Sequence, residues 1–208
     1  MIGILGGTFD PVHNAHLRFA LEVRDRLSLS GVRLIPVRAP PHRASPQAGE
    51  QTRLRMLTAA VGNEKGLVVD DQELRRGGLS YTVDTLDALR QRLSGQSLCL
   101  ILGMDAFSRL TTWHQWRRIL ELAHIAIASR PGTSLPTNGE ISHLLARRET
   151  NDPNCLHKES AGRIIVVPVP QLDISATRIR ARVAESASIR YLVPDSVLEI
   201  IRHEQLYV

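Results

Sequence analysis

The stretch that decides the fold is MIGILGGTFDPVHNAH, residues 1–16. An apolar run ends in the pair Gly6-Gly7, and an acidic-proline corner then leads to two histidines, His13 and His16. We expect the apolar run to form a strand and the histidines to begin the next helix. At such a junction, the free N–H groups and the positive end of the helix dipole favour an anion. The segment therefore predicts an anionic ligand, and α/β proteins commonly hold phosphates at such a junction.

Working outward from this stretch, short apolar runs alternate with helical patterns. The predicted strands are 2–5, 32–37, 67–69, 98–102, 125–128 and 164–169. The predicted helices are 17–29, 53–61, 82–93, 113–122 and 141–146. Strands separated by helices predict an α/β fold with a mainly parallel sheet, covered by helices on both faces.

The chain changes character after residue 169. An extended loop over 170–174 precedes a helix that begins at Ser175 and ends at Val183. A last helix is expected to begin at Pro194-Asp195, with Asp195 as its N-cap, and to end near His203. We expect one domain over 1–208, with a core over 1–169 and a small C-terminal helical segment over 170–208.

The basic charge rests almost entirely on arginine. Of the 26 basic residues behind the net charge of +5, only Lys65 and Lys158 are lysines. Guanidinium groups suit bidentate contacts with phosphate. Aromatic residues make up only 4% of the chain and no run of like charges occurs, so a stacking surface for nucleic acid is not expected.

The remaining composition indicates a cytoplasmic protein. Cys99 lies in an apolar run and Cys155 in a predicted polar loop, and their spacing suggests neither a disulfide nor a metal site. The apolar stretches are too short to span a membrane, and Met1 leads directly into a strand rather than a targeting peptide. We expect no membrane partner.

The glycine turn does not match the common nucleotide-binding patterns. A dinucleotide fingerprint needs Gly-x-Gly-x-x-Gly and a P-loop needs Gly-Lys-Ser/Thr, and neither is present. Zinc is disfavoured because His13 and His16 make only half of a tetrahedral site. A spacing of three instead puts both imidazoles on one helix face, where they can donate to the same phosphate.

A second group of polar residues occurs at 174–180, ISATRIR. Ser175 and Thr177 open a helix, and Arg180 follows within two turns. Free N–H groups, hydroxyls and a guanidinium could surround a polyphosphate. A capping turn with solvated arginines is the alternative.

Taken together, the two segments resemble the nucleotidylyltransferase superfamily. Further segments are similar to one branch, the bacterial nicotinate-mononucleotide adenylyltransferases: PPHR at 40–43, SYT at 80–82, LGMD at 102–105, TWH at 112–114, RPG at 130–132 and Leu206-Tyr207. The resemblance implies a Rossmann-like, doubly wound fold. It also implies adenylyl transfer from ATP to nicotinate mononucleotide by in-line attack, with Mg²⁺ held mainly by the ATP phosphates rather than by a protein metal site.

The resemblance also implies a set of site residues. The catalytic residues would be His13, His16 and Arg180. ATP would be bound by Gly6, Gly7, Thr8, Phe9, Ile174, Ser175, Thr177 and Arg180. The mononucleotide would be bound by Arg43, Tyr81, Thr82, Gly103, Asp105, Trp113, His114 and Arg130.

Within the mononucleotide set, the family pattern gives several residues a role. Trp113 would stack on the pyridine ring, Thr82 and the loop at His114 would meet its carboxylate, Arg43 would pair with the phosphate, and Asp105 would bind a ribose hydroxyl. Two alternatives stay open. Trp113 could be a core residue of its helix, and Asp105 could be an N-cap.

The sequence departs from the family pattern at four positions. Ala15, Val37, Leu79 and His114 stand where glycine, asparagine, proline and an aromatic residue are usual. We expect the methyl group of Ala15 to crowd the nucleotide slightly, and Val37 to remove a polar contact to the mononucleotide.

Three alternatives to this function remain open. Nicotinamide mononucleotide or phosphopantetheine could be the acceptor in the same reaction. A non-catalytic nucleotide- or nucleic-acid-binding protein is the alternative from another class. The sequence does not predict the oligomeric state.

Overall fold

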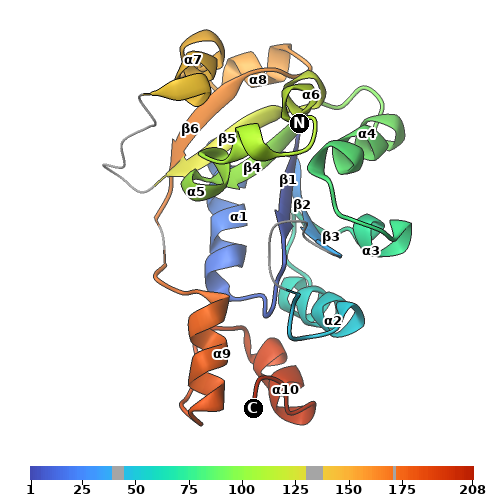
Figure 1. Cartoon of the computed structure of the whole chain (residues 1–208), viewed down its shortest axis with the longest axis vertical. Coiled ribbons are helices and arrows are strands. Elements are labelled where there is room, and N and C mark those ends of the chain that lie inside the picture. Colours follow the sequence, from blue (N-terminus) through green and yellow to red (C-terminus); the bar gives the residue numbers. More distant parts are fainter. Residues whose placement is uncertain (39–44, 130–137, 171) are drawn as a thin grey trace.

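A six-stranded parallel sheet forms the centre of the structure, a computed structural model that describes residues 1–38, 45–129, 138–170 and 172–208. The strand order is β3-β2-β1-β4-β5-β6 (Figure 1). The strands are β1 (Ile2–Gly7), β2 (Gly31–Pro36), β3 (Leu67–Val69), β4 (Leu98–Gly103), β5 (His124–Ser129) and β6 (Ile164–Pro168). Every pairing between them is parallel, which confirms the predicted Rossmann-like α/β fold.

The order of the strands reverses at the centre of the sheet. Strand β1 pairs with β2 on one side and with β4 on the other, so the chain passes outward to β3 and then returns to build β4, β5 and β6. At such a reversal the loops beyond the carboxyl ends of the two central strands diverge and leave a crevice. The loop after β1 leads to α1 (Asn14–Arg26), and β4 leads to α5 (Met104–Phe107).

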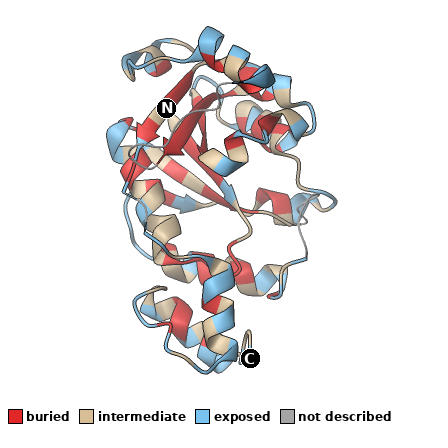
Figure 2. Cartoon of the chain, turned by 60° about the vertical axis from the view of Figure 1, so that its left-hand side comes forward, coloured by how far each residue is buried: buried red, intermediate tan, exposed pale blue. Residues whose placement is uncertain are grey.

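Two hydrophobic clusters cover the two faces of the sheet. Alternate strand side chains enter opposite clusters: Cys99 and Ile101 of β4 point to one face, and Leu98 and Leu100 to the other. One cluster includes side chains of α1, α2 (Glu50–Val61), α8 (Asn154–Lys158), α9 (Ala176–Ala184) and α10 (Asp195–His203). The other includes side chains of α4 (Thr82–Arg92), α6 (Trp116–Leu122) and α7 (Gly139–Arg148). In Figure 2 the strands are mostly buried, whereas the helices that cover them carry both buried and exposed residues.

The last two helices lie together at one end of the molecule, below the carboxyl ends of β1 and β2 (Figure 1). Helix α10 packs against α2 and buries Val197, Leu198 and Ile201 in the first cluster. The C-terminal residues then return to the first loop, where the Tyr207 hydroxyl donates to a carboxylate oxygen of Asp10 at 2.8 Å. The chain therefore closes on the loop that follows its first strand.

The predicted helix over 113–122 is divided in the structure. A short 3-10 turn, η1 (Leu110–Thr112), precedes it, and α6 begins only at Trp116. Trp113 has extended backbone and Gln115 has a left-handed φ of 48°, so no continuous helix can pass through them. Trp113 is therefore not a core residue of a helix.

Two other helix starts differ from the prediction. Helix α1 begins at Asn14 instead of residue 17 and ends at Arg26, because Ser28 turns the chain with a φ of 50°. Helix α10 has Pro194 as its N-cap, whose carbonyl accepts from Val197 and Leu198. The prediction that Asp195 is the N-cap is wrong; its carboxylate lies in the first turn, where the helix dipole favours it.

Some short helices had no recognisable periodicity. Among them are α3 (Gln72–Arg76) and α8, which contains Cys155, so the prediction that Cys155 lies in a loop is wrong. Cys99 is fully buried in β4, and burial raises the pKa of its thiol to about 12, which leaves it unreactive at neutral pH. Within the described ranges, none of the helices combines the length and apolar character of a membrane span.

Candidate active site

The two histidines lie at the start of α1, as the sequence predicts. His13 is the N-cap and His16 is in the first turn, where its Nδ1 accepts from the backbone N–H of His13 at 3.3 Å. The two rings stack with their centroids 3.6 Å apart and an interplanar angle of 17°. They therefore share one face of the helix and can act on one ligand.

Burial keeps both imidazoles neutral at neutral pH. It lowers the pKa of His13 to about 4, and together with the charge of His13 it lowers the pKa of His16 well below its ordinary value. Nδ1 of His13 is buried and has no hydrogen-bond partner among the described residues. A neutral ring has one N–H donor, so the pair can act on an anion by hydrogen bonding and not by a positive charge of its own.

Asp10 organises the loop between β1 and α1. Asp10 is 4% exposed, and its carboxylate accepts from the backbone N–H groups of Gln47 and Ala48, at 2.8 and 3.0 Å, as well as from the Tyr207 hydroxyl. Burial and the hydrogen bond to Asp10 raise the pKa of Tyr207, so its hydroxyl keeps the proton that it donates. The acidic-proline corner is visible in the sequence, but these partners are not.

Arg180 connects the second predicted segment to the first. Its Nη1 donates to the carbonyl oxygen of Asp10 at 2.6 Å and lies 3.8 Å from the Asp10 carboxylate. The 174–180 segment thus meets the loop after β1, as a site formed from both segments requires. The guanidinium faces the protein backbone here, and any contact with ATP is in addition to this bond.

Arg53 of α2 is a buried residue of the site that the sequence analysis missed. It is 1% exposed, and its Nη1 donates to the carbonyl oxygens of Thr8 and Val37, at 2.7 and 2.8 Å. Burial lowers the pKa of this guanidinium, opposed by the charge of Asp10. Because Thr8 follows β1 and Val37 follows β2, one side chain holds both loops at the carboxyl edge of the sheet.

The two glycines of the turn have different surroundings. A Cβ on Gly6 would have no neighbour within 4 Å among residues 1–38, 45–129, 138–170 and 172–208, whereas a Cβ on Gly7 would lie 2.8 Å from the ring of Phe9. Phe9 is 2% exposed and packs edge-on against His16, with the ring centroids 5.0 Å apart. Gly6 is thus open to a ligand, while Gly7 makes room for Phe9, whose side chain belongs to the core.

A cavity of about 310 Å³ opens beyond the carboxyl ends of β1 and β4. It brings together many of the predicted residues from both sets: Gly6, Gly7, Thr8, Tyr81, Thr82, Gly103, Trp113 and His114. Asp105 does not line it. Asp105 lies in the first turn of α5, whose N-cap is Gly103, so the alternative that Asp105 is an N-cap is wrong. The predicted residues Arg43 and Arg130 lie outside the described residues.

The wall of this cavity near Trp113 is suited to a ring with an anionic substituent. The rings of Tyr81 and His114 lie with their centroids 4.5 Å apart. Tyr81 is the N-cap of α4, and its side chain makes no hydrogen bond to the helix, so the first N–H groups of α4 lack a side-chain cap. Trp113 both lines the cavity and packs against the second hydrophobic cluster.

The same wall contains a buried acid that the sequence analysis did not identify. Glu73 of α3 is 5% exposed, and its Oε1 accepts from the hydroxyl of Thr85 at 2.6 Å. Its Oε2 is buried without a hydrogen-bond partner among the described residues. Burial raises the pKa of this carboxyl, opposed by the hydroxyls of Ser80 and Thr85. A possible signal was the position of Glu73 shortly before Ser80-Tyr81-Thr82.

The 174–180 segment lines a second, separate cavity of about 240 Å³. Ile174 and Ser175 line it together with Arg178, Arg182 and Arg190, whereas Thr177 and Arg180 do not. Ser175 is the N-cap of α9, where its hydroxyl oxygen accepts from the N–H of Arg178 at 3.2 Å. The capping alternative is therefore confirmed for Ser175.

The departures from the family pattern have specific positions. Ala15 is the second residue of α1 and is half-buried. Val37 lines the first cavity, and its carbonyl oxygen is the one that accepts from Arg53. Leu79 is 49% exposed and does not line that cavity.

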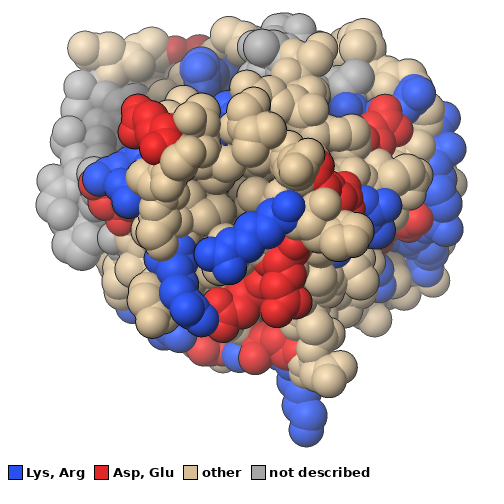
Figure 3. All heavy atoms as spheres, turned by 90° about the horizontal axis from the view of Figure 1, so that it is seen from below, with Lys and Arg blue, Asp and Glu red and all other residues tan. Residues whose placement is uncertain are grey.

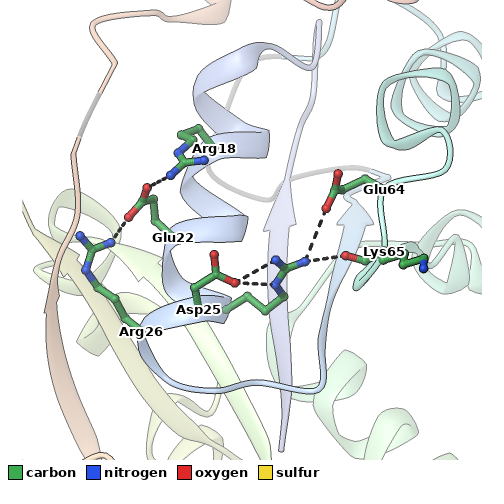
Figure 4. A network of polar contacts seen from close by, with 7 residues as sticks. Arg18, Glu22, Asp25, Arg26, Glu64 and Lys65 are labelled. Atoms are coloured by element: carbon green, nitrogen blue, oxygen red, sulfur yellow. Dashed lines mark hydrogen bonds and ion pairs between the residues drawn. The ribbon is translucent and has the colours of Figure 1, made fainter.

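Charged side chains away from the cavities pair with one another. Figure 4 shows Glu22 of α1 between Arg18 and Arg26. Arg24 pairs with Asp25 and Glu64 and donates to the carbonyl oxygen of Lys65. Figure 3 shows acidic and basic side chains side by side on the face seen from below. Among the described residues of this face, the basic side chains therefore alternate with acidic ones, unlike the continuous basic surface that is typical of nucleic-acid binding.

The similarity to known proteins covers the whole chain. The cytidylyltransferase-like family model matches residues 4–182. The chain is 48% identical over 208 residues to a probable nicotinate-nucleotide adenylyltransferase of Methylococcus capsulatus, with 100% of this chain and 99% of that protein covered. It is 45% identical over 206 residues to a protein of the same description from Aeromonas hydrophila, with 99% and 96% covered.

A solved structure has a similar fold. Plasmodium falciparum nicotinic acid mononucleotide adenylyltransferase complexed with NaAD superposes with a TM-score of 0.74 over 99% of this chain and 96% of that one. The sequences are 17% identical, so this likeness concerns the fold alone.

Proposed function

This chain belongs to the cytidylyltransferase-like family, and from that membership we propose that it transfers the adenylyl group of ATP to nicotinate mononucleotide. The products are deamido-NAD and pyrophosphate. The relatives that match over the full chain carry the name of this activity. The protein is thus a nucleotidyltransferase of NAD biosynthesis.

One structural observation carries the proposal. A single cavity has the open glycine turn after β1 on one side and Tyr81, Thr82 and Trp113 on another. An adenylyltransferase must bring two phosphate-bearing nucleotides to one point. His13 and His16 do not line this cavity; they begin the helix that follows its glycine turn along the chain. Bringing the reactants together and aligning them provides much of the acceleration in phosphoryl-type transfer.

The chemical step needs no covalent enzyme intermediate. A phosphate oxygen of the mononucleotide attacks the α-phosphorus of ATP, and the bond from that phosphorus to the bridging oxygen breaks to release pyrophosphate. The neutral rings of His13 and His16 donate hydrogen bonds to phosphate oxygens, and Arg180 adds a fixed positive charge. No side chain has to accept a proton, because the attacking phosphate is already an anion.

The contacts with ATP extend to Thr8, Ile174, Ser175 and Thr177 in this proposal. Gly6 supports close approach of a nucleotide because its Cβ position is open. Phe9 would act through its backbone and through its packing against His16. Arg43, Asp105 and Arg130 keep their proposed roles on the mononucleotide side, with Trp113 stacking on the pyridine.

Mg²⁺ on the triphosphate is part of the proposal. It would neutralise charge on ATP as pyrophosphate leaves. Over the described ranges there is no group of three His, Cys, Asp or Glu side chains that could hold a metal ion. The proposal therefore assigns the ion mainly to the phosphates of ATP.

Two further features belong to the proposal. The chain would act as one domain over 1–208, since α10 and Tyr207 are joined to α2 and Asp10. It would work in the cytoplasm, where its nucleotide substrates are found.

Pyrophosphate release tests the function. The protein is incubated with Mg·ATP and with nicotinate mononucleotide, nicotinamide mononucleotide or phosphopantetheine in turn. We expect the fastest release with nicotinate mononucleotide. Absence of release with this acceptor contradicts the proposal, and faster release with the amide reassigns the acceptor.

A further inference from the structure

The clearest unexplained group in the molecule is the free oxygen of Glu73. The side chain lines the first cavity and is 5% exposed, and its Oε2 has no hydrogen-bond partner within the part of the chain that the structure describes. Leaving a buried polar atom without a partner costs free energy. An orphaned oxygen in the wall of a cavity is satisfied when a ligand supplies the missing partner.

The other contacts of Glu73 hold its position. The Thr85 hydroxyl donates to Oε1 at 2.6 Å. The Ser80 hydroxyl also acts on the Glu73 carboxyl, whose pKa it lowers, and it is held in place by accepting from the Arg38 N–H at 3.0 Å. Thr85 lies one turn after the start of α4, and Tyr81 and Thr82 line the same cavity. Glu73 is thus fixed beside the wall that would receive the pyridine substituent.

We propose that Glu73 is a specificity-determining residue that carries a proton when nicotinate mononucleotide binds, and that its Oε2–H donates to the substrate carboxylate. The inference rests on the proposed function. An ionised Glu73 would instead repel a carboxylate and accept from the NH₂ group of an amide. The protonation of one buried side chain therefore sets the preference between acid and amide.

The surroundings of Glu73 favour the neutral form. Burial raises the pKa of its carboxyl, and the negative charge of Asp70 raises it further, while Arg76 and the hydroxyls of Ser80 and Thr85 lower it. Asp70 is itself paired with Arg33 and Arg92. The same cavity is lined by Tyr81, Arg109 and His114. A bound carboxylate raises the pKa of Glu73 further, because two adjacent carboxyl groups repel each other when both are ionised and are more stable with one proton between them.

The first test is the pH dependence of specificity. The ratio of kcat/KM for nicotinate to that for nicotinamide mononucleotide is measured between about pH 5 and about pH 9. In the wild type we expect the ratio to fall as Glu73 ionises, approaching about tenfold for each pH unit above its pKa. Glu73→Gln keeps the shape and a donor without ionising, so it should flatten this dependence and retain at alkaline pH the preference that the wild type loses.

Two control variants isolate the effect. Glu22→Gln changes a carboxyl on α1 that pairs with Arg18 and Arg26 and does not line the cavity, and it should keep the wild-type dependence. His114→Gln replaces the imidazole that lines the same cavity; because His114 belongs to the proposed mononucleotide site only the slope is compared, and the slope should be kept. A slope that disappears with His114 and persists in Glu73→Gln overturns the proposal, as does a flat ratio in the wild type.

The second test does not depend on turnover. Calorimetric titration with nicotinate mononucleotide in two buffers of different ionisation enthalpy measures the protons taken up on binding, at a pH where the specificity ratio of the wild type has already fallen and Glu73 is ionised in the free protein. The wild type should take up more protons than Glu73→Gln, and equal uptake contradicts the proposal. If neither mononucleotide yields pyrophosphate, the proposed function fails. If both do but the ratio does not respond to Glu73, only the role of Glu73 fails.

Discussion

Two buried carboxyl groups, Asp10 and Glu73, lie in two regions of the site and differ in the hydrogen bonds that their oxygens accept. Asp10 accepts hydrogen bonds from Gln47, Ala48 and Tyr207, so the protein satisfies both of its oxygens. Glu73 has Thr85 at one oxygen and nothing at the other among the described residues. The difference separates a group that holds the fold from one that is left for a ligand.

Replacing Asp10 should have the largest effect. Asp10→Ala leaves two backbone N–H groups and Tyr207 without their acceptor and removes the negative charge beside Arg180, so we expect a loss of about 3–5 kcal/mol in the free energy of unfolding. Urea unfolding measures this loss. Glu73→Gln is the matched comparison and should change the same quantity by less than about 1 kcal/mol. Similar losses in both variants would remove the distinction between the two regions.

A substitution at His16 tests the region of Asp10, at the start of α1. His16→Ala removes one hydrogen-bond donor to the transferring phosphates, and kcat should fall about a hundredfold, roughly 2.7 kcal/mol of transition-state stabilisation. ATP binding should change far less. Single-turnover kinetics and equilibrium ATP binding separate the two quantities. An unchanged kcat would show that the histidine pair is structural.

The two glycines provide a matched pair within one turn. Gly7→Ala places a methyl group 2.8 Å from the Phe9 ring, and this overpacking should cost about 2 kcal/mol in the free energy of unfolding. Gly6→Ala meets no atom of the described residues within 4 Å; it should leave stability nearly unchanged while raising the KM for ATP. Thermal unfolding together with steady-state kinetics distinguishes these results; equal destabilisation would mean that both glycines serve packing.

The pH dependence of stability is the smallest expected effect. Because the pKa of His13 is about 4 in the folded protein and 6.5 ordinarily, the unfolded chain binds more protons between these values. Stability should therefore rise with pH across that window and fall as the solution is acidified. From pH 7 to 5.5 the loss from this residue is about 1 kcal/mol. Urea midpoints at the two pH values should differ less in His13→Asn, and an equal difference would assign the effect to other groups.

The sequence predicted most of the fold because its signals are local. The strand β3 was predicted with its observed bounds, and the other strands agree within one or two residues at each end. Helix α4 was predicted to begin at Thr82, and it begins there in the structure. The error at Trp113 arose because apolar spacing alone does not show that Gln115 turns the backbone to a positive φ. The very short helices have too few residues to display a period.

The candidate site was only partly accessible to sequence reasoning. The spacing of His13 and His16 predicted that they share a helix face, and the stacked rings confirm it. The spacing of residues did not single out Arg53 or Glu73, because a charged residue in a helical pattern is ordinarily solvent-exposed. Their burial depends on partners elsewhere in the chain, such as the carbonyl oxygens that Arg53 meets.

By itself, the sequence determined the alternation of strands and helices and the two polar segments that resemble a nucleotidylyltransferase. Only the tertiary structure decided that Arg180 and Tyr207 meet Asp10, and that Glu73 lines the cavity with one buried oxygen that has no partner among the described residues. The physical reason is that periodicity and capping act over a few neighbouring residues. The hydrogen bonds that complete Asp10 join residues up to 197 positions apart, and they exist only once the chain has folded.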